Sequence, residues 1–389
     1  MVLAIQNHDA HIACIEPYVP VDPWLEAALR SVLTSGRLTN HGPHVLALER
    51  ALSGWLEEDI LAVSSGSTAI EIGLRAIQLV ADPHQPRALV LPACTYVATL
   101  NAVQRANYTP VFCDIDPTTW TLCPDALGAI LRSRSDIAVV LPVNVYGVSP
   151  DLPRIRALAN RAGARVLYDC AHGLGTRVPD SFRQQGAHVT AWSMHATKLL
   201  PAGEGGLIAS DDPRILESVR LLRNHGIGAD PLATVLGSNG KLSELHAAVA
   251  LASFRRLDSI LARRRAHMTR LSGFLRQLAP RRVQLQACAP GVESNAQNLT
   301  VLVTDDAGVP APLLAARWIA ALADLNVEAR RYFWPPLHHL RRLNARAVSL
   351  PVTDAVMPAL VCLPLHTEMV EATLARLEIA LERSLTGLN

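Results

Sequence analysis

Residues 164–169, ARVLYD, and residues 189–198, VTAWSMHATK, are the stretches of sequence that decide the fold. Each begins with a short apolar run that is typical of a buried strand. The first run ends in Asp169, and the second is followed by Lys198. Similar apolar runs recur between helical patterns at residues 60–64, 88–92, 110–115, 137–143 and 206–210. Strands that alternate with helices predict an α/β fold, in which helices cover both faces of a mostly parallel sheet.

The length of 389 residues corresponds to two or three domains at roughly 150 residues each, and we expect one large and one small domain. A helical pattern without proline runs from Leu242 to Leu278 and is long enough to join them. After it, strand-like and helical patterns follow at residues 283–287, 299–303, 327–333 and 370–385. The sequence therefore predicts a large α/β domain at 1–260, with an N-terminal arm at 1–20, and a smaller α+β domain at 261–389.

The composition argues against several classes of partner. The formal net charge is +2, from 36 basic and 34 acidic side chains, and no run of five like charges occurs. We therefore expect no nucleic-acid partner. Because the sequence contains neither a stretch of about 18 apolar residues nor a signal-peptide pattern, we expect a cytoplasmic protein without a membrane partner.

The spacing of cysteine and histidine argues against a disulfide framework and against a metal site. The seven cysteines are scattered and form no C-x-x-C pair. The adjacent His338 and His339 lack the i, i+4 spacing that puts two imidazoles on one helical face. We therefore expect no metal ion.

Lysine is nearly absent from the chain. Only Lys198 and Lys241 are lysines, so the other 34 of the 36 basic residues are arginine. An arginine stays protonated, whereas a lysine can lose its proton and attack a carbonyl carbon. The two lysines are therefore candidates for chemistry.

Polar residues follow three predicted strands, at the sheet edge where α/β proteins bind ligands. The run Ser64–Thr68 leads into a helix whose N-terminal N–H groups suit a phosphate, and it equally suits an ordinary helix cap. Asp169 can pair with a cation or cap the next turn, and Lys198 can be reactive or simply solvated. Together they supply the three groups that pyridoxal phosphate requires, for its phosphate, its pyridinium nitrogen and its aldehyde. The combination predicts a pyridoxal phosphate enzyme.

The chain also resembles the DegT/StrS-type sugar aminotransferases, from about Tyr18 to Leu385. These are fold-type I pyridoxal phosphate enzymes, so the resemblance implies that fold and that cofactor. Nine segments carry it in the family's order: GRLTNHGPHVLALE, VSSGSTAIEIGL, LPACTYVATLNAV, PVFCDIDPTTW, PVNVYG, YDCAHGLG, SMHATKLLPAGEGG, GSNGKLSELHAAVAL and RRYFWPPLH.

The resemblance assigns roles to individual residues. It implies that Lys198 binds the cofactor covalently, that Asp169 pairs with the pyridine nitrogen, and that Tyr96 stacks on the ring. Four residues would hold the phosphate: Gly66, Ser67, Thr68 and Ser193. Asn239 would reach the phosphate from a second subunit, so the resemblance implies a homodimer with shared active sites.

Two positions depart from the commonest family pattern. His172 stands where most relatives carry Gln, and Asn239-Gly240-Lys241 stands where many carry Asn-Tyr-Arg. Both variants are similar to a subgroup that acts on thymidine-diphosphate-linked 4-keto-6-deoxyhexoses. His172 is expected to hydrogen-bond the ring hydroxyl of the cofactor. We expect Tyr332, His338 and Lys241 to contact the substrate, although Tyr332 and His338 also suit a packing role where the domains meet.

The sequence thus predicts an aminotransferase that moves an amino group from glutamate, or a similar amino acid, to a keto group of a nucleotide-linked deoxysugar. A keto-cyclitol or another cyclic ketone as acceptor would preserve every cofactor residue. A sugar dehydratase of the same fold is disfavoured, because those relatives carry His where this chain has Lys198. A pyridoxal phosphate-binding regulatory protein without turnover is the alternative from another class.

Overall fold

The computed structural model describes residues 11–82, 84–180, 187–340 and 348–386; residues 1–10 of the expected N-terminal arm lie outside these ranges. Its large sheet has seven strands, and the sheet order is β1 (Ile60–Val63), β7 (Gly206–Ser210), β6 (Val189–Ser193), β5 (Arg165–Asp169), β4 (Ile137–Val140), β2 (Ala88–Pro92) and β3 (Thr109–Cys113). Strand β7 is antiparallel to both neighbours, and the other adjacent pairs are parallel. The predicted α/β fold with a mostly parallel sheet is confirmed.

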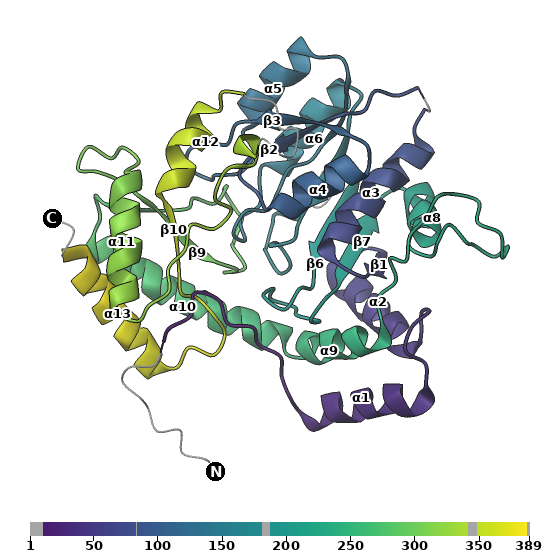
Figure 1. Cartoon of the computed structure of the whole chain (residues 1–389), viewed down its shortest axis with the longest axis horizontal. Helices are drawn as coiled ribbons and strands as arrows, with labels where there is room; N and C mark the ends of the chain where they lie inside the picture. Colours follow the sequence, from purple (N-terminus) through teal and green to yellow (C-terminus); the bar gives the residue numbers. More distant parts are fainter. Residues whose placement is uncertain (1–10, 83, 181–186, 341–347, 387–389) are drawn as a thin grey trace.

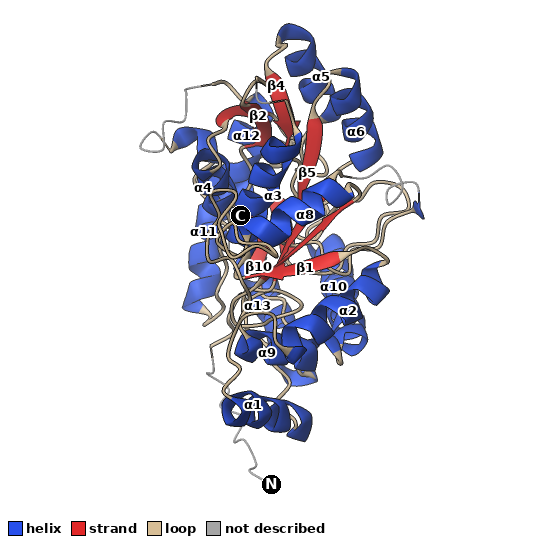
Figure 2. Ribbon diagram, turned by 90° about the vertical axis from the view of Figure 1, so that its right-hand side faces the viewer, coloured by secondary structure: helices blue, strands red, loops and turns tan. Residues whose placement is uncertain are grey.

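Helices cover both faces of this sheet, because successive side chains of a strand point to opposite sides. In β2, Leu89 and Leu91 pack into the core on one face of the sheet, whereas Ala88 and Val90 pack into the core on the other face. Figure 2 shows strands β4 and β5 between these two layers. The helices of the first face are α3 (Gly66–Val80), α4 (Val97–Arg105) and α8 (Pro213–Leu222). Those of the second are α5 (Pro124–Ser133), α6 (Leu152–Arg161), α2 (Pro43–Leu56) and α9 (Glu244–Phe254).

A second, antiparallel sheet has the order β10 (Leu360–Leu363), β9 (Leu299–Val303) and β8 (Val283–Leu285). It packs against α11 (Pro312–Asp324) and α13 (Glu371–Thr386). The expected strand-like segment 327–333 forms only isolated bridges, between Val327 and Ile12 and between Arg330 and Cys362. The third strand is β10 instead, which the sequence pattern did not indicate. The remaining elements are α1 (Pro23–Ser35), η1 (Leu337–His339), α12 (Pro351–Val356) and η3 (Met357–Ala359).

The expected single helix from Leu242 to Leu278 is wrong, because the structure has two helices, α9 and α10 (Leu257–Leu278), separated at Arg255 and Arg256. The reason is a change of packing partners. Helix α9 packs beneath the large sheet, and α10 begins there through Leu257, Ile260 and Leu261. It ends in the core of the small sheet through Leu271 and Leu275. Figure 1 shows the two helices end to end along the lower side of the molecule.

Helix α10 thus spans both sheets, and the 260/261 domain boundary, which falls inside it, stays a prediction. In the described ranges, no helix is both long and apolar enough to cross a membrane.

Arg264 of α10 ties the small sheet's loops to the large sheet. Its guanidinium is buried and donates hydrogen bonds to the carbonyl oxygens of Ala296 at 3.0 Å, Gln297 at 2.8 Å and Leu365 at 2.9 Å. Asn295, which precedes Ala296 in the chain, donates through its side-chain Nδ2 to the carbonyl oxygens of His172 and Leu174 at 2.7 and 2.8 Å. The loop 295–297 therefore connects α10 to the segment that follows β5.

We expect Arg264→Met to lower the free energy of unfolding by about 3 kcal/mol, because it leaves three buried carbonyl groups without a donor. The matched control is Arg263→Met, which removes only the exposed ion pair with Glu368 and should cost less than about 1 kcal/mol. Urea unfolding followed by circular dichroism measures both. Equal losses in the two variants would contradict the structural role of Arg264.

Candidate active site

The N-terminus of α3 lies at the carboxyl edge of the large sheet, where the sequence predicts a phosphate cradle. Ser65 caps the helix, and its Oγ accepts a hydrogen bond from the N–H of Thr68 at 3.1 Å. A Cβ atom on Gly66 would lie 2.7 Å from the Cβ of Ser193, the last residue of β6, so only glycine allows this approach. The structure therefore brings Gly66, Ser67 and Thr68 together with Ser193, around N–H groups that favour an anion.

Asp169 ends β5 on the same face of the sheet and is buried. Its Oδ2 accepts a hydrogen bond from the hydroxyl of Thr99 at 2.8 Å, and its Oδ1 accepts one from the N–H of Ala171 at 3.1 Å. Burial raises the pKa of Asp169, and these two hydrogen bonds and the charge of Lys198 oppose that shift. The carboxylate is thus positioned for a further cationic partner.

Lys198 follows β6, in a turn where its N–H donates to the carbonyl oxygen of His195 at 2.9 Å. Burial lowers the pKa of Lys198 to about 8, and the charge of Asp169 opposes that shift. The turn is also held from the small sheet, because Gln297 Nε2 donates to the carbonyl oxygen of Thr197 at 3.1 Å. Lys198 can therefore become a neutral amine close to neutral pH.

His172 is buried three residues after Asp169. Burial and the charge of Lys198 lower its pKa well below the ordinary value, so the imidazole is neutral at working pH. Its Nδ1 is buried and has no hydrogen-bond partner among the described residues. A buried polar atom of this kind needs a partner, which fits the expected contact with a ring hydroxyl.

Aromatic side chains surround His172. The ring centroid of Tyr332 lies 6.1 Å and that of Phe333 5.5 Å from the imidazole. Tyr96, at the start of α4, has its ring 6.2 Å from that of Phe333 and is 59% exposed. The hydroxyl of Tyr146 donates to the carbonyl oxygen of Tyr332 at 3.1 Å. Phe333 therefore contacts both Tyr96 and Tyr332, two of the expected contact residues, and joins them in one aromatic cluster beside His172.

Residues 239–241 run beside the cradle of their own chain. The N–H of Ser64 donates to the carbonyl oxygen of Gly240 at 2.8 Å, and Lys241 forms a bridge with Val63 of β1. Asn239 is exposed. Lys241 is half-buried, and burial lowers its pKa. The segment thus has a direct route to its own cradle, so the chain path itself does not argue that Asn239 serves a second subunit.

His338 lies apart from these residues, at the edge of the large sheet near Phe112. It is buried, and its Nε2 lies 2.9 Å from Asp354 Oδ1, while His339 Nε2 lies 3.1 Å from the same oxygen. The ligand atoms of these three residues lie within 4.8 Å of one another, a grouping that could hold a metal ion. The i, i+4 spacing of histidines does not reveal this grouping, because its third member, Asp354, comes fifteen positions after His339. A hydrogen bond from His338 and an ion-pair contact from His339, both to Asp354 Oδ1, account for the grouping without a metal ion.

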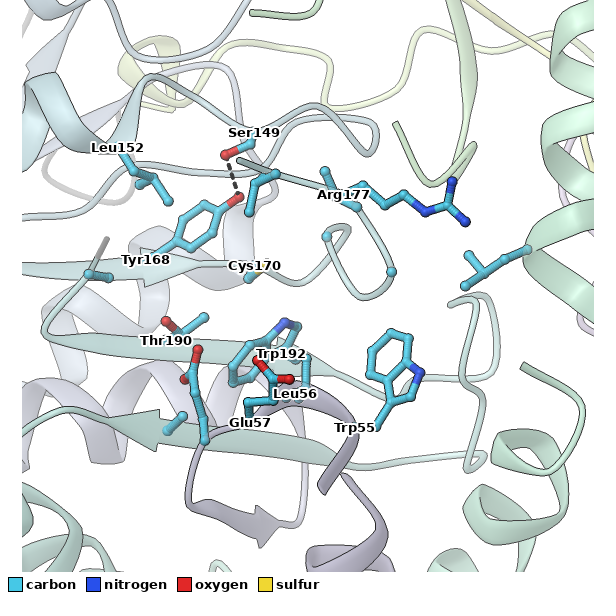
Figure 3. A pocket seen from close by; sticks show the side chains of 18 of the residues that line it. Trp55, Leu56, Glu57, Ser149, Leu152, Tyr168, Cys170, Arg177, Thr190 and Trp192 are labelled. Carbon is cyan, nitrogen blue, oxygen red and sulfur yellow. Dashed lines mark hydrogen bonds between the residues drawn. The ribbon is translucent and has the colours of Figure 1, made fainter. Parts of the chain in front are cut away.

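A cavity of about 820 Å³ lies away from the predicted site. Figure 3 shows it lined by Tyr168, Thr190 and Trp192. Because successive side chains of a strand point to opposite faces, these three side chains lie on the face of the sheet opposite to Asp169 and Ser193. The cavity opens between α6, the end of α2 and the start of α10. None of the predicted site residues lines it.

Sequence reasoning missed three residues that shape the site: Thr99, Asn295 and Phe333. Thr99 and Phe333 lie inside the segments that carry the family resemblance, so their nearness in sequence to Tyr96 and Tyr332 was an available signal. Asn295 has no such signal, because its contact with His172 joins residues more than 120 positions apart.

The cradle, the buried carboxylate and the lysine with a lowered pKa lie at one sheet edge, and they fit pyridoxal phosphate. The close approach at Gly66 and the unpartnered Nδ1 of His172 agree with that fit. The class of protein is therefore a pyridoxal phosphate-dependent enzyme of fold type I.

The chain matches the model of the DegT/DnrJ/EryC1/StrS aminotransferase family over residues 22–381, and it belongs to that family. It is therefore an aminotransferase that uses pyridoxal phosphate.

Solved structures share the fold. Helicobacter pylori PseC, an aminotransferase involved in the biosynthesis of pseudoaminic acid, superimposes with a TM-score of 0.86 at 19% identity, over 97% of this chain and 100% of PseC. CalS13, a sugar aminotransferase from Micromonospora echinospora, gives 0.82 at 22% identity, over 94% and 98%. NtdA from Bacillus subtilis, solved with the cofactor PMP bound, gives 0.83 at 24% identity, over 93% and 81%.

We expect the rate at which the apoprotein attaches pyridoxal phosphate to rise with pH and to level off above about 8, the pKa of Lys198. At pH 7 roughly 10% of this amine is neutral, against less than about 0.1% for an ordinary lysine. The negative charge of Asp169 favours the protonated form of Lys198. Asp169→Asn removes that charge and should therefore move the midpoint to lower pH. Visible absorbance after rapid mixing measures the rate.

Lys241→Arg is the matched control for this titration, since it removes the other lysine and should leave the midpoint in place. A midpoint near pH 10, or a midpoint that rises in Asp169→Asn, would show that Lys198 is not in the environment described above.

Proposed function

We propose that this aminotransferase moves an amino group from glutamate to the keto carbon of a nucleotide-linked deoxysugar, and most specifically of a dTDP-4-keto-6-deoxyhexose. The observation that best supports this chemistry is the lowered pKa of the Lys198 amine, which lies within electrostatic reach of the buried Asp169. The sugar acceptor is supported by the family and by relatives such as CalS13. The deoxyhexose is supported by His172 and by Asn239-Gly240-Lys241, which match the subgroup pattern.

Asp169 has the role of keeping a negative charge next to the pyridine nitrogen. Pyridoxal phosphate, when bound, supplies an electron sink that stabilises negative charge on the substrate carbon. A protonated ring nitrogen strengthens that sink, and Asp169 keeps it protonated. Thr99 fixes the orientation of the carboxylate through its 2.8 Å hydrogen bond.

Lys198 has two roles, covalent attachment and proton transfer. An amine with a pKa of about 8 can both accept and donate a proton near neutral pH, which is the range in which a general acid–base group works best. Its turn is fixed by backbone and side-chain hydrogen bonds on both sides, from Lys198 to His195 and from Gln297 to Thr197.

We place the substrate near Tyr332, next to His172, and Lys241 at the side of the cradle. His338 was expected to contact the substrate. Its Nε2 is occupied by Asp354 and its ring lies near Phe112, so we assign it to packing at the edge of the large sheet, although its buried Nδ1 has no partner among the described residues. The cytoplasmic location and the domain division at 260/261 remain part of the proposal.

The decisive experiment incubates the purified holoenzyme with glutamate and either a dTDP-4-keto-6-deoxyhexose or a keto-cyclitol. We expect an aminated nucleotide sugar by mass spectrometry. Asp169→Asn should lower turnover about 10²- to 10³-fold while the cofactor stays bound, because it removes a preorganised charge. Amination of the cyclitol alone would overturn the sugar proposal, and no amination of any acceptor would favour the regulatory alternative.

Borohydride reduction adds a control that depends on the chain's two lysines. It should fix the cofactor on the peptide that contains Lys198, and Lys198→Arg should lose both this label and turnover, since a guanidinium does not give up its proton at neutral pH. Lys241→Arg should keep the label.

We also propose a homodimer with shared active sites, in which Asn239 contacts the phosphate of the partner. Asn239 is exposed, and the loop before it presents two exposed apolar side chains, Leu232 at 70% and Leu236 at 83%. Exposed apolar side chains next to an active-site edge favour a protein interface there. A two-fold axis would then give each site one copy of this loop.

Complementation tests the shared site. A mixture of Lys198→Ala subunits and Asn239→Asp subunits, each inactive alone, should regain about a quarter of wild-type activity after random exchange, because half of the dimers are mixed and one of their two sites is intact. Subunit exchange is verified independently by native mass spectrometry. Exchange without recovered activity, or full activity of Asn239→Asp alone, would refute the shared site and leave Asn239 a loop residue.

A further inference from the structure

Two buried thiols meet at the edge of the small sheet. The Sγ atoms of Cys14 and Cys362 lie 3.7 Å apart, although the residues are 348 positions apart in the chain. Their residues are 1% and 0% exposed. Neither residue belongs to the candidate active site. All seven cysteines are free thiols, and Cys288 is the exposed one.

The backbones of both cysteines are held in place. Ile12 forms a bridge with Val327, and the N–H of Cys14 donates to Glu328 Oε2 at 3.0 Å. Cys362 lies in β10 and exchanges two backbone hydrogen bonds with Arg330, at 2.7 and 3.0 Å. The segment 12–14 and β10 therefore present their sulfur atoms to each other from fixed positions.

The sulfur of Cys362 lies among hydrogen-bond donors. The thiol of Cys14 donates to it at 3.7 Å, and Asn298 Nδ2 donates to it at 3.6 Å. The hydrogen bond from Cys14 is the first cause of a lowered pKa of Cys362, and the charge of Arg330 adds to it. Burial also raises the pKa of Cys362, but these contacts outweigh it, whereas burial dominates at Cys94 and Cys170 and raises the pKa of both thiols. Cys362 is thus the better nucleophile of the pair.

We propose that Cys14 and Cys362 form an oxidative modification site, at which a peroxide converts the two thiols into a disulfide. The Cys362 thiolate attacks one oxygen of hydrogen peroxide, which breaks the O–O bond and leaves a sulfenic acid and hydroxide. The Cys14 sulfur then attacks the Cys362 sulfur, forming the S–S bond and releasing the second oxygen as hydroxide. The two thiol protons convert both hydroxides to water, so one peroxide oxidises two thiols.

Access to the pair depends on a short segment. The contact of residues 12–14 with the rest of the chain includes the bridge to Val327 and the hydrogen bonds of Cys14 with Glu328 and Leu365. These bonds lie outside the named strands, so local release of residues 12–14 would expose the Cys14 sulfur and the side of Cys362 that Cys14 covers, without breaking a strand pairing. The resulting disulfide would close nearly the whole chain into one ring, and a long ring restricts the unfolded chain strongly.

The experiment treats the holoenzyme carrying Cys288→Ser with hydrogen peroxide, so that the exposed thiol cannot react. We expect an intact mass lower by about 2 Da and a cross-linked peptide containing Cys14 and Cys362. The Tm should rise by about 5 °C, and dithiothreitol should reverse both changes.

Two single variants in the same background, Cys14→Ala and Cys362→Ala, serve as matched controls, with folding verified by circular dichroism. Each should lose the cross-link and the rise in Tm. The same treatment in guanidinium should give mixed pairings, which would show that the native fold selects this pair. A native protein that keeps its mass, that only gains oxygen, or that links other cysteines would overturn the proposal.

Discussion

The buried negative charge of Asp169 is the constraint on which the site depends. A carboxylate that is 2% exposed loses most of its hydration, and burial raises its pKa accordingly. The hydroxyl of Thr99 and the N–H of Ala171 recover part of that cost, and Lys198 contributes charge. A protonated ring nitrogen would supply a direct cationic partner. The same electrostatic coupling reaches His172, whose pKa is lowered by burial and by the charge of Lys198.

The pleat of the large sheet decides which side chains lie together at the candidate site. Leu167 and Ala191 point to the face covered by α3 and α4. Asp169 and Ser193, two positions further along the same strands, point to that face as well. A shift of one residue in either strand would turn these polar side chains toward the other face, where Tyr168 and Trp192 line the large cavity. The apolar residues of β5 and β6 therefore fix the position of the polar residues that follow them.

The sequence supports prediction of the parts of the molecule that depend on local pattern. The short apolar runs located every strand of the large sheet, and residues 66–68, Asp169 and Lys198 follow from their places after those strands. The division of α9 from α10 could not be predicted in this way, because both helices have helical patterns and only their packing partners differ.

Long-range contacts were also out of reach. The hydrogen bond between Thr99 and Asp169, the contact of Asn295 with His172 and the approach of Cys14 to Cys362 each join distant residues. Which of many buried Thr, Asn or Cys side chains meet is set by the packing of whole elements, which no local pattern records.

The distribution of lysine and arginine has a physical explanation. Arginine supplies five N–H donors in a fixed plane and holds several carbonyl groups at once, as Arg264 does, or a carbonyl and a carboxylate, as Arg223 does with Ala62 and Glu49. Neither task requires loss of a proton. Both lysines, in contrast, lie at the carboxyl edge of the large sheet, Lys198 after β6 and Lys241 beside the end of β1. The chemistry proposed for Lys198 requires its neutral form, and burial makes that form accessible near neutral pH, whereas an arginine would stay protonated there.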